Sequence, residues 1–476
     1  MATGSTRQGA TNLIGGEWES SRRSIEVEDL ADGGVFARRP AATAEQARAA
    51  VAAAAGAERA MRETTIVQRA NWLTAIADGL LERKAELADA IVREAGKPVS
   101  SARGEVDSAA ERFRRAAEEA RDNQGDFIEG TTEGHEGWQA VVKPQPVGTV
   151  LCITPYNYPL ATTALQVAPA LAAGNSVVLK PASKTPVSAG ILAEVIAEVG
   201  VPAGGFNFVC GRASDIGDAL ASDDRVDAIA LTGSSRAGER IADTSGMVTL
   251  HMELGGNAPA LVFPDADLDR AADDCAKGSF KYAGQRCSAV SRVLAHDAIH
   301  DELVDRLETR VDEWQPGPLF DEGTAIGPLI SESQAEWVME LVGDAVDRGA
   351  ELVRGGDRDG RTVEPTLLAD VPHDARILHE EQFGPVAVVA RVADESEALA
   401  LANADDMGLD AAVFTADHDR AMRLADDIEA GAVRINGAPS HGLGDIPFGG
   451  VGDSGIGREG IGYSIETLTT TKSIVL

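Results

Sequence analysis

The sequence is poor in lysine, cysteine and aromatic residues. Only eight of its 476 residues are lysine, and aromatic residues make up 4%. The four cysteines, Cys152, Cys210, Cys275 and Cys287, form no CxxC pair and are too few for a disulfide framework. Neither a GxSxG nor an HExxH motif occurs, which disfavours a serine hydrolase and a zinc protease. We therefore expect a protein of the reducing cytoplasm that works without a metal.

Long apolar runs and positive charge are also lacking. The most apolar stretch, Thr163 to Leu179, contains Gln166, Pro169 and Asn175 and is too short and polar to span a bilayer. The amino terminus leads into no apolar segment typical of a signal peptide. With 43 basic against 76 acidic residues, the net charge of −33 repels phosphate backbones and anionic lipids. We expect a small-molecule ligand, and neither nucleic acid nor membrane as a partner.

The acidic charge is dispersed along the chain, and this dispersion combined with scarce lysine is typical of proteins kept soluble in concentrated salt. Salt at 1 M screens charges within about 3 Å, which makes such a surface tolerable. An ordinary acidic cytosolic enzyme would have a similar balance. Composition therefore favours a halophilic protein and leaves the second interpretation open.

The first part of the chain has helical spacing. Thr43-Ala-Glu-Gln46 forms a capping-box signature ahead of an alanine-rich run. Apolar residues then recur at helical spacing from Leu73 to Ile91, until Gly96 and Pro98 end the run. A third helix is predicted from Ser101 to about Arg121.

Beyond residue 147, short apolar runs alternate with helical segments. The expected strands of the first block are Val147–Ile153, Ser176–Leu179, Phe206–Val209, Asp227–Leu231 and Val248–Met252. A second block, from about 260 to 436, has strands expected at Ser291–Ala295, Val386–Arg391 and Ala412–Thr415. This alternation predicts an α/β fold with two doubly wound parallel sheets, which bind ligands beyond the carboxyl ends of their strands.

Polar motifs follow the strands of the first block. They are Ile153-Thr-Pro-Tyr-Asn157-Tyr-Pro159, Lys180-Pro-Ala-Ser183-Lys184-Thr-Pro, Thr232-Gly233-Ser234-Ser-Arg-Ala-Gly238 and Glu253-Leu-Gly255-Gly256-Asn257. Farther along are Phe280-Lys-Tyr-Ala-Gly284-Gln285-Arg286-Cys287-Ser288, Glu380–Val386 and Pro447–Gly450. A GxGxxG at Gly455–Gly460 lies too near the carboxyl terminus to open a βαβ unit, so we interpret it as a loop.

In their order and approximate spacing, these seven motifs resemble those of the aldehyde dehydrogenase superfamily over nearly the whole chain. The resemblance implies that Cys287 is the nucleophile, Glu253 the general base and Asn157 an oxyanion donor. The chemistry needs the same residue types, because a thiolate adds readily to an aldehyde carbonyl and the resulting oxyanion needs aimed donors. A carboxylate can then activate the water that hydrolyses the thioester. The other three cysteines match no family motif and are expected to be structural.

The resemblance also implies a nicotinamide cofactor. The expected cofactor contacts are Ile153, Thr154, Lys180, Ser183, Lys184, Gly217, Gly233, Ser234, Glu381 and Phe383. Many NAD-using relatives carry glutamate at the position of Ser183, where its carboxylate would repel the 2′-phosphate of NADP. Serine flanked by two of the eight lysines therefore favours NADP over NAD, although Lys184 is equally well interpreted as a solvent-facing side chain.

By the same resemblance, residues 1–123 and 147–255 form a dinucleotide-binding domain and residues 256–447 a catalytic domain. Residues 124–146 and 448–476 would form a small β oligomerisation element, as in a homodimer or homotetramer. Asn257 replaces a lysine that is common at this position of the family, a feature that resembles the succinic-semialdehyde-type members. The segments Gly452–Gly460 and Gly104–Ala120 more closely resemble those of lactaldehyde and glyceraldehyde dehydrogenases. We expect a small polar aldehyde to be oxidised to its acid. Arg286 would pair with an anionic group of the substrate or serve as a structural arginine of the loop.

Two alternatives remain at this stage. In an acylating aldehyde dehydrogenase, coenzyme A replaces water as the group that attacks the thioester; the presence of Glu253 favours water. A catalytically silent binding or structural protein on the same fold would not need Cys287, Glu253 and Asn157 together. Their presence favours an enzyme.

Overall fold

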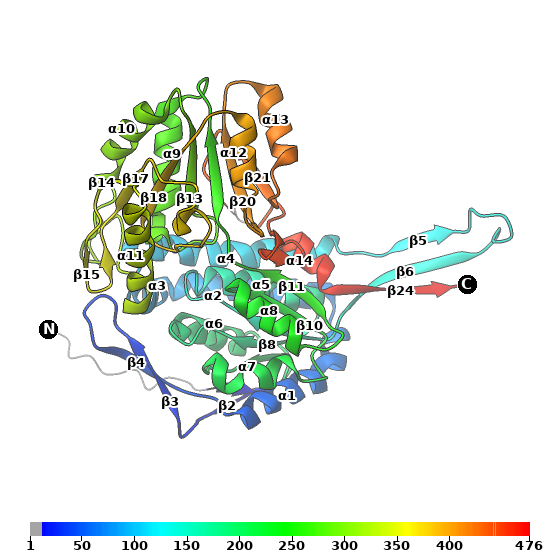
Figure 1. Cartoon of the computed structure of the whole chain (residues 1–476). Helices are drawn as coiled ribbons and strands as arrows, with labels where there is room; N and C mark the ends of the chain where they lie inside the picture. The colour runs from blue at the N-terminus through cyan, green and yellow to red at the C-terminus, as the bar shows by residue number, and fades with distance from the viewer. Residues whose placement is uncertain (1–11, 441, 443) are drawn as a thin grey trace.

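The computed structural model, which describes residues 12–440, 442 and 444–476, contains two sheets flanked by helices and a projecting arm (Figure 1). The first sheet consists of β1 (Asn12–Ile14), β2 (Glu17–Glu19), β7 (Thr149–Ile153), β8 (Ser176–Lys180), β9 (Phe206–Phe208), β10 (Ala228–Thr232), β11 (Thr249–Glu253) and β23 (Gly455–Ile456). Their order is β2-β1-β9-β8-β7-β10-β11-β23, and the five strands from β9 to β11 are parallel. The predicted doubly wound sheet is thus present.

Helices cover both faces of this sheet because successive strand residues point to opposite sides. They are α1 (Ala44–Arg62), α2 (Ile66–Glu82), α3 (Lys84–Ala95), α4 (Val99–Asp122), α5 (Ala161–Ala173), α6 (Pro186–Glu198), α7 (Ala213–Ala221) and α8 (Ser235–Thr244). In β8, Val177 and Leu179 belong to the apolar core of α2, α4, α5 and α6. Val178 between them joins the core of α1 and α7 on the other face.

The helical predictions are confirmed in part. Thr43 caps α1: its side chain accepts a hydrogen bond from the Gln46 backbone N–H, and the Gln46 side-chain oxygen in turn accepts one from the Thr43 backbone N–H. The single helix expected from Leu73 to Ile91 is wrong, because the chain breaks at Arg83 into α2 and α3. Arg83 pairs there with Glu86 and with a carboxylate of α6. No glycine or proline marks this break in the sequence.

The helical start predicted for the chain is also wrong. Two strand pairs precede α1: β1 with β2, and the hairpin of β3 (Ser24–Glu28) and β4 (Val35–Pro40). The signal was present in β3, where buried Ile25 and Val27 alternate with exposed residues. Such a period of two is typical of a half-buried strand.

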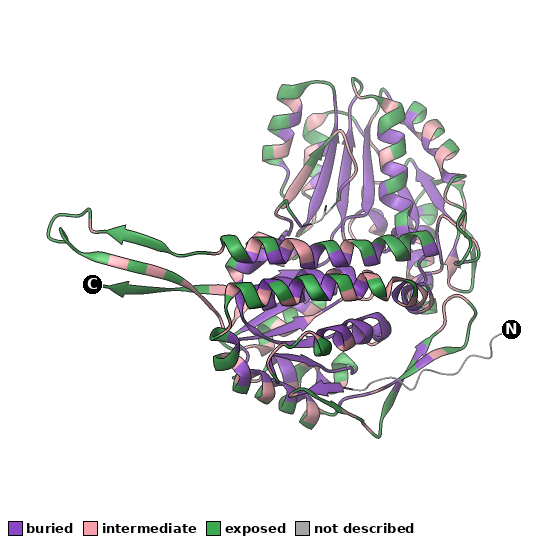
Figure 2. Ribbon diagram, turned by 180° about the vertical axis from the view of Figure 1, so that it is seen from behind, coloured by how far each residue is buried: buried purple, intermediate pink, exposed green. Residues whose placement is uncertain are grey.

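The second sheet has the order β14-β17-β18-β13-β12-β20-β21. Its strands are β12 (Ala258–Val262), β13 (Val290–His296), β14 (Glu351–Arg354), β17 (Thr366–Ala369), β18 (Val386–Val392), β20 (Asp410–Phe414) and β21 (Ala432–Ile435). Its helices are α9 (Leu268–Phe280), α10 (His300–Val311), α11 (Glu332–Asp347), α12 (Glu395–Ala402) and α13 (His418–Asp427). Figure 2 shows that the strands of this sheet are buried and that each helix beside them has one buried and one exposed face. The two parallel-sheet domains are as predicted.

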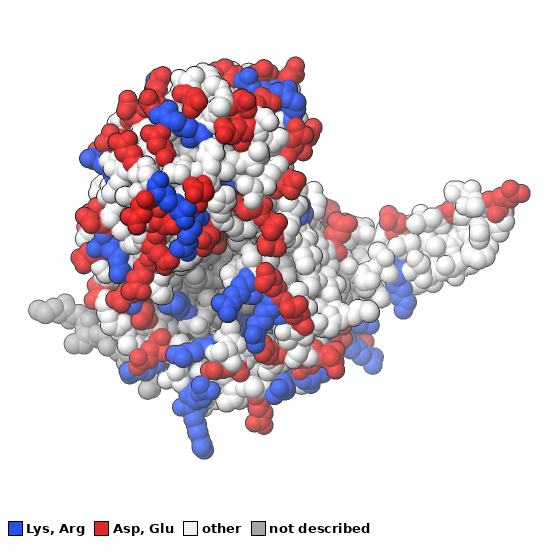
Figure 3. Space-filling model, in the orientation of Figure 1, with Lys and Arg blue, Asp and Glu red and all other residues white. Residues whose placement is uncertain are grey.

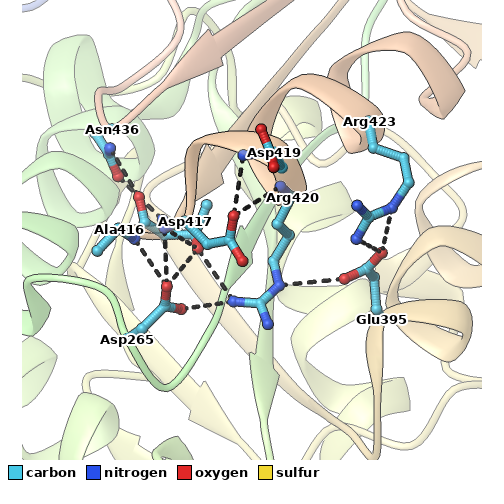
Figure 4. Close-up of polar contacts among 9 residues, drawn as sticks. Asp265, Glu395, Ala416, Asp417, Asp419, Arg420, Arg423 and Asn436 are labelled. Carbon is cyan, nitrogen blue, oxygen red and sulfur yellow. Dashed lines mark hydrogen bonds and ion pairs between the residues drawn. The ribbon is translucent and has the colours of Figure 1, made fainter.

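A polar network ties α12 and α13 to the second sheet (Figure 4). Asp265 accepts hydrogen bonds from the Thr415 hydroxyl at 2.8 Å, from the Asp417 backbone at 3.0 Å and from Arg420 at 2.8 Å. Arg420 also donates to Glu395 of α12 at 3.2 Å. One planar guanidinium thus joins two carboxylates, a geometry that lysine cannot reproduce.

The arm consists of β5 (Asp126–Glu129), β6 (Gln139–Pro146) and β24 (Thr469–Val475), in the order β24-β6-β5. It projects from the body (Figure 1), and most of its residues are exposed (Figure 2). Residues 448–476 are divided among three sheets, of which one is the pair formed by β22 (Val451–Gly452) and β19 (Met407–Gly408). β23, part of the expected loop, pairs with β11, α14 (Ile461–Thr467) buries Ile461 and Ile465 in the α4–α5 core, and only β24 joins the arm.

The remaining short elements are β15 (Arg358–Asp359), β16 (Thr362–Val363), β19 (Met407–Gly408), β22 (Val451–Gly452) and the 3-10 helices η1 (Lys281–Gly284) and η2 (Arg376–Leu378). No helix in the described part of the chain combines the length and apolarity needed to cross a bilayer.

Candidate active site

The carboxyl ends of four neighbouring strands meet at one edge of the first sheet. Ile153 at the end of β7 is in register with Lys180 of β8 and with Leu231 of β10. Thr232 is in register with Glu253 of β11. The strand order reverses direction between β7 and β10, which is where doubly wound sheets place their ligands. The motifs predicted from sequence therefore lie side by side.

Cys287 reaches this edge from the second domain, in the turn between η1 and β13. The chain turns sharply before it, because Tyr282 and Ala283 adopt left-handed φ values of 56° and 50°. Gly284 has φ +71° and approaches the backbone of Gly384 so closely that a Cβ would lie 1.9 Å from its carbonyl oxygen. Such a strained, closely packed turn fixes the position of the residue that follows it.

The three predicted catalytic residues line one cavity of about 510 Å³. Cys287 is half-buried, whereas Glu253 and Asn157 are 2% and 6% exposed. The Asn157 amide nitrogen donates to the Gln285 carbonyl at 3.0 Å, so the amide lies beside the turn that carries the cysteine. An amide and a thiol on the same cavity wall are suited to hold a carbonyl between them.

A half-buried thiol and a buried carboxyl face each other in this cavity. The Cys287 thiol and the Glu253 carboxyl are hydrogen-bonded. Burial raises the pKa of Glu253 well above its ordinary value, and the charge of Glu459 raises it further. Burial and the charge of Glu253 likewise raise the pKa of Cys287. The thiol is therefore protonated at rest, and its nearest acceptor for the proton is Glu253.

Glu459 is a site residue that the motifs did not reveal. It is 5% exposed, lines the cavity and accepts a hydrogen bond from the Thr232 hydroxyl at 3.3 Å. Burial raises the pKa of its carboxyl to about 7, against the opposing charge of Arg112. In the sequence, the feature that could have indicated Glu459 is its position as the one carboxylate of the glycine-rich segment Gly455–Gly460. In the structure, this segment pairs with the strand that ends at Glu253.

Four cationic side chains line the same cavity: Lys97, Arg112, Lys281 and Arg286. Arg112 of α4 is 8% exposed, and its Nε has no hydrogen-bond partner among the described residues. Arg286 donates instead to the Ser288 hydroxyl and the Pro439 carbonyl. The carboxylates of Glu105, Glu253 and Glu459 line the cavity as well, and Glu105 is paired with Lys97. Arg112 is therefore the cation of this cavity best suited to meet an anion.

A second cavity, of about 1230 Å³, contains the turn after β8. Ser183 and Lys184 line it, together with Arg212 and Arg361, which sequence analysis did not single out. Arg361 is paired with Glu28 at 2.8 Å. Lys180 is 4% exposed and donates to the Pro181 carbonyl at 3.3 Å. Hydroxyl and cationic groups at the end of a strand fit a phosphorylated ribose.

The other predicted cofactor residues are distributed along the same edge. The Thr154 backbone donates to the Lys180 carbonyl at 3.2 Å. Gly233 precedes Ser234, whose hydroxyl caps α8. Gly217 lies in α7, which an ion pair between its neighbour Asp218 and Arg240 joins to α8.

Glu381 and Phe383 come from the second domain. Glu381 accepts a hydrogen bond from the Gly256 backbone at 3.0 Å, and Phe383 meets the Tyr156 ring edge-on at 6.0 Å. Tyr156 and Phe383, from motifs of the two domains, thus meet where the domains face each other. Within the described ranges, no group of three His, Cys, Asp or Glu side chains is arranged to hold a metal ion.

A doubly wound sheet with a cysteine and a carboxylate at its switch point defines a nicotinamide-dependent oxidoreductase that acts through a thiol. Residues 18–474 match the model of the aldehyde dehydrogenase family. The chain belongs to this family, whose members oxidise aldehydes with NAD or NADP.

Two curated relatives cover almost the whole chain. The NADP-dependent glyceraldehyde-3-phosphate dehydrogenase of Streptococcus equinus is 38% identical over 98% of both chains. The NADP-dependent succinate-semialdehyde dehydrogenase of Escherichia coli is 39% identical over 95% of both chains. Among solved structures, the NADP-dependent glyceraldehyde-3-phosphate dehydrogenase of Bacillus halodurans in complex with NADP superposes with a TM-score of 0.97, at 38% identity and 99% coverage of both chains.

Proposed function

We propose that this aldehyde dehydrogenase oxidises a small aldehyde carrying a negative charge and uses NADP as its preferred cofactor. The observation that carries the substrate class is Arg112, a buried guanidinium in the cavity of Cys287 whose Nε has no hydrogen-bond partner among the described residues. The names of several relatives agree, since glyceraldehyde-3-phosphate, succinate semialdehyde and sulfolactaldehyde carry phosphate, carboxylate and sulfonate. Two other relatives are named for lactaldehyde, which is uncharged.

In the proposed mechanism, Glu253 accepts the proton of Cys287 as the thiolate attacks the aldehyde carbon. The hydrogen bond between the two side chains supports this transfer. The Asn157 amide donates to the Gln285 carbonyl at 3.0 Å in this structure. When the aldehyde is attacked, the amide would turn and donate to the oxyanion, which the Cys287 backbone N–H also contacts. One well-placed oxyanion donor accelerates such a step by about 10²–10³-fold.

A nicotinamide cofactor, held beside Glu381 and Phe383, would supply the hydride acceptor for this chemistry. Loss of hydride from the tetrahedral carbon would leave a thioester on Cys287. Glu253 first releases the thiol proton to solvent. It then removes a proton from the attacking water and returns that proton to the sulfur, so that the acid departs as the thiol re-forms. The buried carboxyl of Glu253 has Oε1 unpartnered in the described part of the chain, so it can accept that proton. This arrangement favours water over coenzyme A as the acyl acceptor.

A panel of aldehydes tests the substrate class. We expect kcat/KM for succinate semialdehyde or glyceraldehyde-3-phosphate to exceed that for butanal or propanal, because a charge-assisted contact contributes about 1.5–3 kcal/mol, or ten- to a hundredfold. Arg112→Met should remove this advantage and leave the uncharged aldehydes unaffected. Equal use of charged and uncharged aldehydes by the wild type would contradict the proposal.

The preference for NADP rests on the cavity beyond β8. Ser183 offers a hydroxyl in place of a repelling carboxylate, and Lys184 and Arg212 line the same cavity. These groups fit the 2′-phosphate, with Lys180 at the end of the strand. We assign cofactor binding to residues 1–123 and 147–255, and the substrate-bearing cysteine to residues 256–447.

Substitution of Ser183 by glutamate should shift the cofactor preference towards NAD. The new carboxylate would repel the 2′-phosphate and lower kcat/KM for NADP by about ten- to a hundredfold, since each lost or opposed phosphate contact costs about 1.5–3 kcal/mol. The measurement is the ratio of kcat/KM for the two cofactors. Ser396→Glu, at an exposed position of α12, adds the same charge elsewhere and should leave the ratio unchanged. A wild type that strongly favours NAD, with a ratio unmoved by Ser183→Glu, would contradict the assignment.

We further propose that the arm joins subunits of a dimer or tetramer. Both outer strands, β24 and β5, have an unpaired edge, which another chain can extend. Phe127, Ile128, Trp138 and Val475 are each more than half exposed, and the arm shows few charges in Figure 3. A deletion of residues 469–476 should therefore yield monomers by light scattering.

The acidic surface supports a halophilic protein of the cytoplasm. Acidic side chains are spread over the body rather than gathered in one patch (Figure 3). We expect the thermal unfolding midpoint to rise from low salt to molar potassium chloride, because the screening length falls from about 10 Å at 0.1 M to about 3 Å at 1 M and repulsion among carboxylates weakens. A midpoint that is constant or falls with added salt would refute this.

A further inference from the structure

Lys97 is a buried cation in the cavity of Cys287 for which the mechanism has no use. It is 2% exposed and follows Gly96, the left-handed residue that ends α3. Its ammonium is paired with the buried carboxylate of Glu105 at 2.5 Å. Burial lowers the pKa of Lys97 to about 8, against the charge of Glu105. A charged ammonium group is costly to bury, so the residues around it show what stabilises it there.

The ammonium lies over two aromatic rings from different parts of the chain. Its distance to the ring centre is 3.6 Å for Tyr158 and 4.3 Å for Tyr282. The two rings meet edge-on at 5.8 Å, and the Tyr282 hydroxyl donates to the Ala95 carbonyl of α3 at 2.8 Å. Cations held over aromatic faces are attracted by the negative charge of the ring face, and more strongly where water is excluded.

Each ring belongs to a loop that carries a reacting group. Tyr158 directly follows Asn157, the proposed oxyanion donor. Tyr282 opens the left-handed turn that leads to Cys287. Glu105 also fixes the loop of Asn157. Its carboxylate oxygen that is not paired with Lys97 accepts hydrogen bonds from the backbone N–H groups of Leu160 and Ala161, at 3.0 and 3.1 Å. One ion pair therefore contacts both loops.

We propose that Lys97 is a positioning residue, which holds the loop of Asn157 against the loop of Cys287. Its place at the corner between α3 and α4 makes the helical layer a fixed support for the amide-to-sulfur geometry. The inference rests on the proposed roles of these two residues. A displacement of about 1 Å at a reacting centre costs on the order of 10²-fold in rate, so loss of this support should lower kcat.

The test compares Lys97→Met with Lys97→Arg and with a matched structural control. Arg69→Met is that control: Arg69 is a half-buried arginine of α2 that donates to the Ala172 carbonyl at 2.8 Å, at the opposite end of α5 from Asn157. Where Lys97→Met leaves Glu105 as an unpaired buried charge and prevents folding, the double variant Lys97→Met with Glu105→Gln takes its place. Thermal unfolding is followed for every variant.

Activity is measured with aldehyde and with para-nitrophenyl acetate, an activated ester that forms the same oxyanion on Cys287 without aldehyde or cofactor. We expect Lys97→Met to lower kcat for both by about ten- to a hundredfold, with KM for NADP unchanged and most of the loss restored in Lys97→Arg. Arg69→Met should lower the unfolding midpoint without changing kcat.

Wild-type kcat in the folded Lys97→Met or double variant would overturn the inference, and so would an equal loss of kcat in Arg69→Met. A wild type that cleaves the ester but oxidises no anionic aldehyde would instead refute the proposed substrate class. In that case the ester rates alone still decide the role of Lys97.

Discussion

Replacement of Cys287 by alanine should abolish aldehyde oxidation and every covalent acyl-enzyme. No other thiol can replace it, because Cys152, Cys210 and Cys275 are all buried and burial raises the pKa of each. The expected loss of kcat is at least about 10⁴-fold, as for removal of other catalytic nucleophiles. Cofactor reduction gives the rate, and intact-protein mass spectrometry gives the acyl adduct.

The matched control is Cys275→Ala, which removes a buried thiol of α9 that belongs to none of the motifs and lines neither cavity. Its kcat should stay within a factor of about two, since a structural side chain changes stability rather than the reacting geometry. Residual oxidation in Cys287→Ala, or an acyl adduct on any other cysteine, would contradict the assignment of the nucleophile.

Replacement of Glu253 by glutamine should stop the reaction at the thioester. Burial and the negative charge of Glu253 raise the pKa of Cys287, and glutamine removes that charge. The thiol loses Glu253 as its proton acceptor but can still lose its proton to solvent, so an acyl-enzyme forms more slowly than in the wild type. Deacylation loses the base that activates water, a contribution of about 10²–10⁴-fold. We therefore expect a burst of reduced cofactor, close to one equivalent per site, followed by slow turnover.

Rapid-mixing absorbance measures the burst, and mass spectrometry should detect a persistent acyl group on Cys287. Addition of a small thiol, which attacks thioesters without a protein base, should release the adduct. Wild-type turnover in Glu253→Gln, or slow turnover with neither burst nor adduct, would show that Glu253 has a different role.

The sequence predicted those parts of the molecule that depend on local pattern. The buried strands were found because a parallel sheet covered on both faces needs apolar strands. The polar residues directly after these strands were found because ligands bind at the carboxyl edge of such a sheet. Asn157, Glu253 and Cys287 meet in one cavity as the motifs required.

Residues placed by packing between distant segments were not found. Arg112 and Lys97 enter the cavity because α4 and the corner before it pack across the first sheet, and neither lies in a strand-end motif. The break at Arg83 depends on an ion pair with Glu194, 111 residues away. Tertiary contacts determine where such a helix ends and which side chains enter a cavity, and they override local helix propensity.

The pairing of β23 with β11 has a consequence for synthesis of the chain. The edge of β11, with Glu253 at its end, is complete only when Gly455 and Ile456 pair with it, about 200 residues later, or about 10 to 40 s at a translation rate of roughly 5–20 residues per second. Throughout that interval the ribosome carries a sheet with an open edge, which invites pairing with other nascent chains. Ribosomes that stall within the second domain should therefore release aggregation-prone fragments, whereas a chain synthesised to its last helix closes its own edge.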